Sequence, residues 1–275
     1  MNFASIGKKR RIFGVDFSGA KDAGRKIWIT EAFVEGDILS ILDCYPVYEI
    51  VSQKSKQRDA CLSTLRSLIL SDSNSVFGMD FPFSLPDTLM SGKDWCSFVS
   101  DFPEDYDSAD DFRKKMQQMG GKTELKRLTD VEVKAPFSIY NLWVYKQTFF
   151  GIRDVLRPLV TSGQACAIPM QKPEKEKSWL MEICPASTLK SENLYIGYKG
   201  RTEKEEKKRA HILDELVNNG IKVPVDIRNK IVKNKDGDAL DSFVASYATY
   251  RSIKKIDDII GKLPDIYLRE GYTFF

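Results

Sequence analysis

Three short apolar segments of this sequence each end on an acidic residue. "RIFGVDFSGA" carries Asp16, "SVFGMDFPFSLP" carries Asp80, and "SWLMEICPAS" carries Glu182. Apolar, β-rich runs bounded by Gly, Pro and Ser predict buried strands. A carboxylate at the end of a buried strand is costly unless it is paired or binds a metal. The three acids therefore constrain how these strands can be arranged.

The order of the neighbouring elements predicts that arrangement. "KIWITEAFV" and "ILSILDCYPV" predict two more strands, joined by the turn signal "EGD", so a three-stranded meander opens the chain. The helical spacing of apolar residues in "QRDACLSTLRSLIL" predicts a helix before the Asp80 strand. Because such crossovers are right-handed and return parallel, the Asp80 strand should lie beside the first strand, with the Glu182 strand beyond it.

The remaining segments complete an α/β pattern. Residues from about 84 to 165 have weaker periodicity and predict a mostly helical insertion, with "QACAIPM" as a candidate strand near its end. "TEKEEKKRAHILDELVNNG" and "DGDALDSFVASYATYRSI" predict two later helices. We therefore expect residues 1–275 to form a single domain, in which helices flank a mixed sheet.

The predicted sheet brings the acids to one edge. Neighbouring strands lie about 4.8 Å apart, and ligands bind at the carboxyl ends of parallel strands in open α/β sheets. Asp238 and Asp241 in "DALD" share one face of a first helical turn. Five carboxylates in one cleft would repel each other, and divalent cations remove that repulsion. Oxygen-only ligands favour Mg²⁺ or Mn²⁺, and a pair of such ions cleaves phosphodiesters.

Each acid also has an ordinary structural interpretation. Asp16 and Asp80 can form Asx turns, and Glu182 can pair with a lysine. Asp238 can be an N-cap, and Asp241 lies in a first helical turn, where acids are favoured. The joint pattern carries more weight than any one residue.

Composition excludes several classes of protein. The chain contains one His, which argues against chemistry that depends on a His base or on several His ligands. Its five Cys residues form no CxxC pair, as expected of reduced thiols in the cytoplasm. We predict no membrane span, because no apolar run approaches about 18 residues, and the N-terminus lacks the apolar core of a secretory signal. The oligomeric state is left open.

The five motifs "GVDFSGA", "GMDFPFSLP", "YKQTFFG", "EICPASTLK" and "GDALDSFVASYATY" resemble those of the domain of unknown function 429 family, predicted ribonuclease H-like nucleases. The resemblance implies a ribonuclease H-like fold, whose five-stranded mixed sheet carries an acid in the middle of the first strand. The pattern is also similar to the RuvC-type Holliday-junction resolvases, in which matching acids bind two metals. By that resemblance the metal ligands are Asp16, Asp80, Asp238 and Asp241. Glu182 belongs to the family's own motif and has no firm counterpart among the resolvases, and it is the fifth candidate catalytic residue.

The predicted function is a metal-dependent nuclease or phosphodiesterase that uses two Mg²⁺ or Mn²⁺ ions on a nucleic acid or another phosphodiester. Ser18 and Gly19 would form a tight turn that a phosphate approaches. The other candidate substrate contacts are Lys146, Lys190, Lys199 and Arg201, and the basic run at residues 8–11 is a weaker candidate. Two alternatives stay open: an actin- or hexokinase-like phosphotransferase, suggested by "DFSGA", and a non-catalytic binding module that retains the fold.

Overall fold

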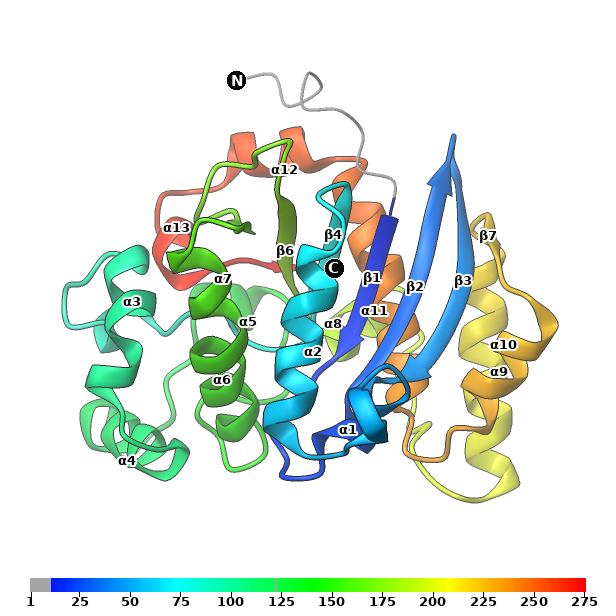
Figure 1. Ribbon diagram of the computed structural model, residues 1–275, viewed down its shortest axis with the longest axis horizontal. Helices are drawn as coiled ribbons and strands as arrows, with labels where there is room; N and C mark the ends of the chain where they lie inside the picture. The colour runs from blue at the N-terminus through cyan, green and yellow to red at the C-terminus, as the bar shows by residue number, and fades with distance from the viewer. Residues whose placement is uncertain (1–10, 122) are drawn as a thin grey trace.

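The chain folds as a mixed β-sheet with helices on both of its faces (Figure 1). The structure is a computed structural model and describes residues 11–121 and 123–275. Residues 8–10 of the basic run lie outside this range, and Arg11 begins the first strand. The architecture confirms the predicted α/β class.

The sheet contains eight strands in the order β5-β6-β4-β1-β2-β3-β7, with β8 pairing with β6. β1 is antiparallel to β2 and parallel to β4, and β4 is parallel to β6. These pairings confirm the predicted opening meander and the predicted neighbours of the first strand. The strands are β1 Arg11–Asp16, β2 Trp28–Glu35, β3 Ile38–Pro46, β4 Ser75–Met79, β5 Ala165–Ile168, β6 Ser178–Ile183, β7 Ile221–Lys222 and β8 Thr273–Phe274.

The sheet is larger than the five strands implied by the family resemblance. β5 was a candidate from the sequence, but β7 and β8 have two residues each and pair only at the margins of the sheet. Segments this short carry no alternation that a sequence pattern could reveal. In addition, Asp16 is the last residue of β1 and does not lie in its middle.

Helices cover the sheet, and none among the described residues is long and apolar enough to cross a membrane. The α-helices are α1 Ala23–Lys26, α2 Arg58–Leu70, α3 Trp95–Asp105, α4 Ala109–Gly120, α5 Leu128–Glu132, α6 Tyr145–Gly151, α7 Arg157–Thr161, α8 Pro185–Ser191, α9 Glu203–Val217, α10 Val225–Lys233, α11 Asp238–Ile253, α12 Ile256–Lys262 and α13 Tyr267–Glu270. A π-helical turn, Ile152–Leu156, joins α6 to α7.

The insertion is more ordered than its sequence suggests. The acidic stretch near residue 105 forms the junction of α3 and α4, and Phe102, Phe112 and Phe149 pack together beneath it. These rings belong to the same buried cluster as Phe13 of β1. The sequence predicted that most of residues 134–160 are helical. Residues 134–144 are not helical, whereas α6, the π-helical turn and α7 follow one another from residue 145 to residue 161. The insertion therefore packs on one face of the sheet through aromatic side chains.

The other face of the sheet is covered by α11, which approaches the central strands closely. A Cβ atom added to Gly14 of β1 would lie 2.1 Å from the Ser242 carbonyl oxygen, and one added to Gly78 of β4 would lie 1.9 Å from Thr249 Oγ1. Both distances are shorter than real Cβ contacts, so these glycines permit the approach. Close packing here brings the first turn of α11 to the carboxyl ends of β1 and β4.

Candidate active site at the carboxyl edge of the sheet

Four aspartates meet where β1 and β4 end. Asp16 is the last residue of β1 and is 8% exposed. Asp80 follows β4, and its backbone N–H donates to the Val15 carbonyl at 2.9 Å, so it extends the ladder beside Asp16. Asp238 and Asp241 lie in the first turn of α11, as predicted. The structure thus brings Asp16, Asp80, Asp238 and Asp241 into one region.

Burial and mutual repulsion shift the ionisation of these carboxyl groups. Burial and the charges of Asp241 and Asp238 hold the pKa of Asp16 well above its usual value. The pKa of Asp80 rises to about 8, chiefly through burial and then through the charge of Asp241. Burial also raises the pKa of Asp238 to about 6. The carboxyl groups are therefore close enough to suppress each other's ionisation.

Asp241 is held from the loop that precedes α9. The Tyr198 hydroxyl donates to Asp241 Oδ1, and Lys199 Nζ lies 2.6 Å from Asp241 Oδ2. The fully buried guanidinium of Arg209 fixes this loop by donating to the Tyr198 carbonyl at 2.7 Å and to the Gly200 carbonyl at 3.1 Å. The sequence analysis named Lys199 for substrate binding, and the structure places it against a carboxylate of the cluster.

Glu182 lies next to the cluster, but both of its oxygens have protein partners. Arg127 Nη2 donates to Oε1 at 2.5 Å and Nη1 donates to Oε2 at 2.8 Å. The Phe83 N–H and the Thr273 hydroxyl also donate to Glu182, each at 2.8 Å. Arg127 is 1% exposed and pairs with Asp130 as well, at 2.7 Å. The charge of Glu182 still contributes to the raised pKa of Asp80.

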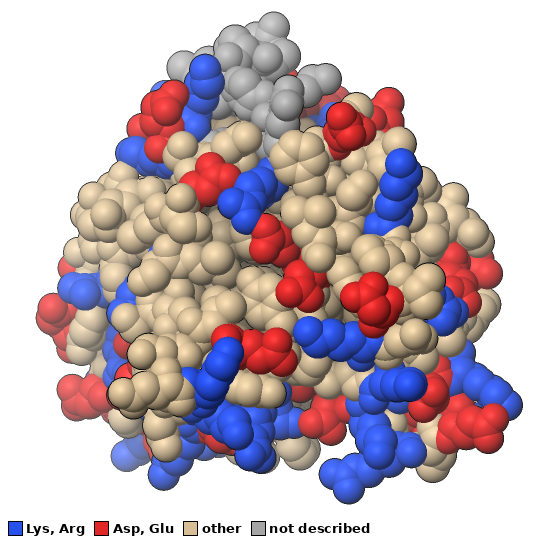
Figure 2. Space-filling model, turned by 45° about the vertical axis from the view of Figure 1, so that its right-hand side comes forward, with Lys and Arg blue, Asp and Glu red and all other residues tan. Residues whose placement is uncertain are grey.

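Nothing in the sequence distinguished Arg127 as a buried, site-forming residue. It is one of 42 Lys and Arg residues and lies in a segment without clear periodicity. Only its burial between Glu182, Asp130 and the Glu270 carbonyl distinguishes it from a surface cation, such as those that Figure 2 shows in blue. The ordinary interpretation of Glu182 as one half of an ion pair is thus met, with an arginine in place of the suggested lysine.

The remaining predicted contacts lie in different places. The Ser18 hydroxyl accepts a hydrogen bond from the Ala20 N–H at 3.3 Å, which forms a local turn. Gly19 packs against the backbone of Lys146, because an added Cβ would lie 2.4 Å from that carbonyl oxygen. The protein's own backbone, not free space for a phosphate, therefore faces Gly19. The side chain of Lys146 is exposed, as is that of Arg201.

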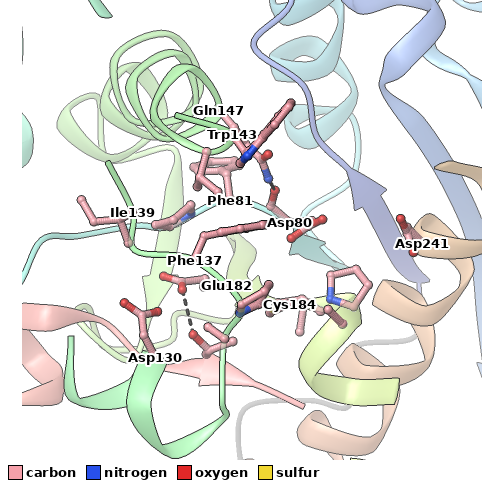
Figure 3. Close-up of a pocket in the computed structure, with 18 of the residues that line it drawn as sticks. Asp80, Phe81, Asp130, Phe137, Ile139, Trp143, Gln147, Glu182, Cys184 and Asp241 are labelled. Atoms are coloured by element: carbon pink, nitrogen blue, oxygen red, sulfur yellow. Dashed lines mark hydrogen bonds between the residues drawn. The ribbon is translucent and has the colours of Figure 1, made fainter. Parts of the chain in front are cut away.

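A pocket of about 500 Å³ adjoins the aspartates (Figure 3). Asp80 and Asp241 form part of its wall, together with Glu182 and Lys199. Residues of the insertion form another part, including Phe137 and Trp143 in the segment between α5 and α6. In Figure 3 Asp241 projects from α11, across the end of β1 from Asp80. Gln147 Nε2 of α6 donates to the Asp80 carbonyl and so links the insertion to the cluster.

The donor chemistry of the cluster fits a hard divalent cation, although the side chains are not arranged as a ligand set. Across residues 11–121 and 123–275, no three His, Cys, Asp or Glu side chains are grouped so as to hold a metal ion as they stand. The donors are nevertheless all carboxylate oxygens, which Mg²⁺ and Mn²⁺ prefer. Asp238 Oδ2 is buried without a hydrogen-bond partner in the described structure, 3.9 Å from Lys26 Nζ. A cation would relieve the repulsion and would compete with Lys199 for Asp241.

Comparisons with protein-family models, with curated proteins and with solved structures find no match to this chain. The geometry of the site is therefore the basis for inferring its chemistry.

Proposed function

We propose that the chain is a metal-dependent phosphodiesterase of ribonuclease H-like fold that cleaves nucleic acid. The observation that carries this proposal is the meeting of Asp16, Asp80 and Asp241, from β1, the end of β4 and α11, beside an open pocket. Buried carboxyl groups that raise each other's pKa favour a functional role over a purely structural one. The site has no His, and carboxylates with a bound cation can cleave phosphodiesters without one.

In this proposal Asp16, Asp80, Asp238 and Asp241 would hold Mg²⁺ or Mn²⁺, which would neutralise charge and activate water. Tyr198 and Lys199 orient Asp241, since each contacts one of its two carboxylate oxygens. The ammonium group of Lys199, whose side chain is 57% exposed, is available to a substrate phosphate once a cation replaces it at Asp241. Glu182 acts as a positioning residue, because through Arg127 it attaches the insertion to β6.

Thermal unfolding tests the metal site directly. Mn²⁺ and Mg²⁺ should raise the Tm of the wild-type chain, because a ligand that binds only the folded state stabilises it. Asp16→Asn should abolish the rise. Asp59→Asn is the control, because this side chain is 91% exposed and takes no part in the cluster, and it should leave the rise intact. A wild-type Tm that neither ion changes would exclude the metal site.

Cleavage assays test the reaction. Single- and double-stranded DNA and RNA and branched junctions are incubated with Mn²⁺, and the wild-type chain should cleave at least one of them. Asp16→Asn and Asp241→Asn should each lower the rate by about a hundredfold or more, because a bound cation contributes several kcal/mol to the transition state. ATP hydrolysis without cleavage of any nucleic acid would instead favour the phosphotransferase alternative.

A further inference from the structure

The pocket beside the aspartates has an exposed aromatic rim. Trp143, Tyr195 and Phe137 are 76%, 49% and 43% exposed, and all three line the pocket. Large aromatic side chains are usually buried, and those exposed around a concave site commonly mark a ligand-binding surface. Phe137 and Trp143 come from the segment between α5 and α6, whereas Tyr195 follows α8. Two separate segments thus present aromatic rings to one cavity.

Two lysines lie beside this rim. Lys190 Nζ lies 4.9 Å from the centre of the Tyr195 ring and donates to the Lys134 carbonyl at 2.6 Å. Lys126 Nζ donates at 2.7 Å to the carbonyl of Ala135, which itself lines the pocket. The rim therefore combines aromatic faces with positive charge.

The pocket's size and its position limit what it can hold. A volume of about 500 Å³ lies within the range of small-ligand sites. A flat heterocycle would meet aromatic faces in the pocket, while a phosphate attached to it would extend toward the lysines and the aspartates. Stacking on aromatic rings beside a basic groove is how proteins bind single-stranded nucleic acid. Bases in a duplex are already stacked and could not enter.

We propose that this pocket binds an unstacked nucleobase of single-stranded nucleic acid, stacked against Trp143 or Phe137, with the adjoining phosphodiester directed toward Asp80 and Asp241. The proposal rests on the phosphodiesterase function proposed above, because only with a bound cation would the aspartates accept a phosphate. It adds a substrate class and two binding residues. It also explains why Trp143 is 76% exposed at the rim of the pocket.

Fluorescence anisotropy with a labelled oligothymidylate of about six nucleotides tests the proposal. Ca²⁺ is present to neutralise the aspartates, and the Mg²⁺ or Mn²⁺ proposed for cleavage is left out. The wild-type chain should bind this probe at least about tenfold more tightly than the same sequence as a duplex, and more tightly than an abasic oligomer of equal length. Trp143→Ala should weaken binding about tenfold, since one stacked base contributes about that much. Phe137→Ala should also weaken it, and Trp143→Phe should restore most of the affinity.

Leu142→Ala is the matched control, because Leu142 is 58% exposed and adjoins Trp143 in sequence but does not line the pocket. Its affinity should equal that of the wild-type chain. Equal affinity for the abasic and thymidylate oligomers would overturn the base pocket. So would wild-type affinity in Trp143→Ala and also in Phe137→Ala, or no detectable binding by the wild-type chain.

The outcomes also separate this proposal from the proposed function. Base-dependent binding in a chain that cleaves nothing and binds no Mn²⁺ would leave the pocket standing and exclude the nuclease. If Trp143→Ala cleaves with metal at the wild-type rate and binds the oligomer with wild-type affinity, the base pocket is excluded and the nuclease function is not. Thymidine mononucleotide should displace the labelled oligomer when the two are present at equal concentration, and this result would support the pocket by showing that the base supplies most of the affinity.

Discussion

Lys199 Nζ lies 2.6 Å from Oδ2 of Asp241. The two side chains differ sharply in exposure, because that of Lys199 is 57% exposed and that of Asp241 only 5%. Asp241 is therefore a buried carboxylate whose charge is balanced from the solvent side. The same ammonium also lowers the pKa values of Asp16, Asp80 and Asp238 against the effect of burial.

Lys199→Met should lower the free energy of unfolding of the metal-free chain by about 1 kcal/mol at pH 7.5. A fully buried pair would contribute more, but half-exposed pairs are screened by solvent. Urea unfolding of both single variants and of Lys199→Met/Asp241→Asn would measure the coupling. Strictly additive effects of the two substitutions would show that the ion pair contributes nothing to stability.

The metal-free chain should become less stable as the pH rises from about 4 to about 8. Asp80 has an ordinary pKa of 3.8 when unfolded and a pKa of about 8 when folded, so between these values the folded state binds more protons. The slope of stability against pH is then negative. Asp16 contributes in the same direction, because its pKa is also raised.

Asp80→Asn isolates this contribution. In EDTA the variant should have a Tm several degrees above that of the wild-type chain at pH 8. The difference should be close to zero at about pH 2.5, below the ordinary pKa of 3.8, where the wild-type carboxyl group is protonated in both states. Asp59→Asn is the control, because this side chain is 91% exposed. A pH-independent Tm difference for Asp80→Asn would contradict the assigned shift.

Arg127→Met should destabilise the chain by about 3–5 kcal/mol, since it leaves Glu182 and Asp130 buried without their partner. Adding Glu182→Gln should restore part of the loss, because it removes one of the two uncompensated charges. The neighbouring Lys126→Met should change stability by no more than about 0.5 kcal/mol, because Lys126 is exposed. Chemical denaturation measures the free energy of unfolding of all three variants. Equal losses of stability in Arg127→Met and Lys126→Met would show that the buried ion pairs of Arg127 do not stabilise the fold.

Gly14→Ala should destabilise the chain by about 3 kcal/mol and reduce the Tm rise produced by Mn²⁺. The new Cβ would overlap the backbone of Ser242 and displace α11, which carries Asp238 and Asp241. Gly261→Ala in α12 is the matched control: no atom lies within 4 Å of the added Cβ, and alanine favours the helix by up to about 1 kcal/mol. Calorimetry with and without Mn²⁺ compares the Tm of the two variants. A wild-type Tm for Gly14→Ala would contradict the close approach of α11 to β1.

The central part of the fold could be predicted because strand order follows from local signals and the handedness of crossovers. The neighbours of β1 on both sides agree with the prediction, and the same order explains why Asp16 and Asp80 meet. The edge strands β7 and β8 could not be predicted, since their pairing depends on where distant segments pack. The sequence predicted a mostly helical insertion but not the bounds of α3 and α4, because charged residues obscure the aromatic side chains that these helices bury.

The sequence by itself determined the α/β class, the central strands and the residue types available for chemistry, because these follow from periodicity, turn residues and composition. Only the tertiary structure decided which charges pair. Glu182 is paired with Arg127 across 55 positions and Asp241 with Lys199 across the sheet edge, whereas Asp238 Oδ2 has no hydrogen-bond partner in the described part of the chain. Charge pairing depends on distance and burial in space, and neither is encoded in the local pattern around a residue.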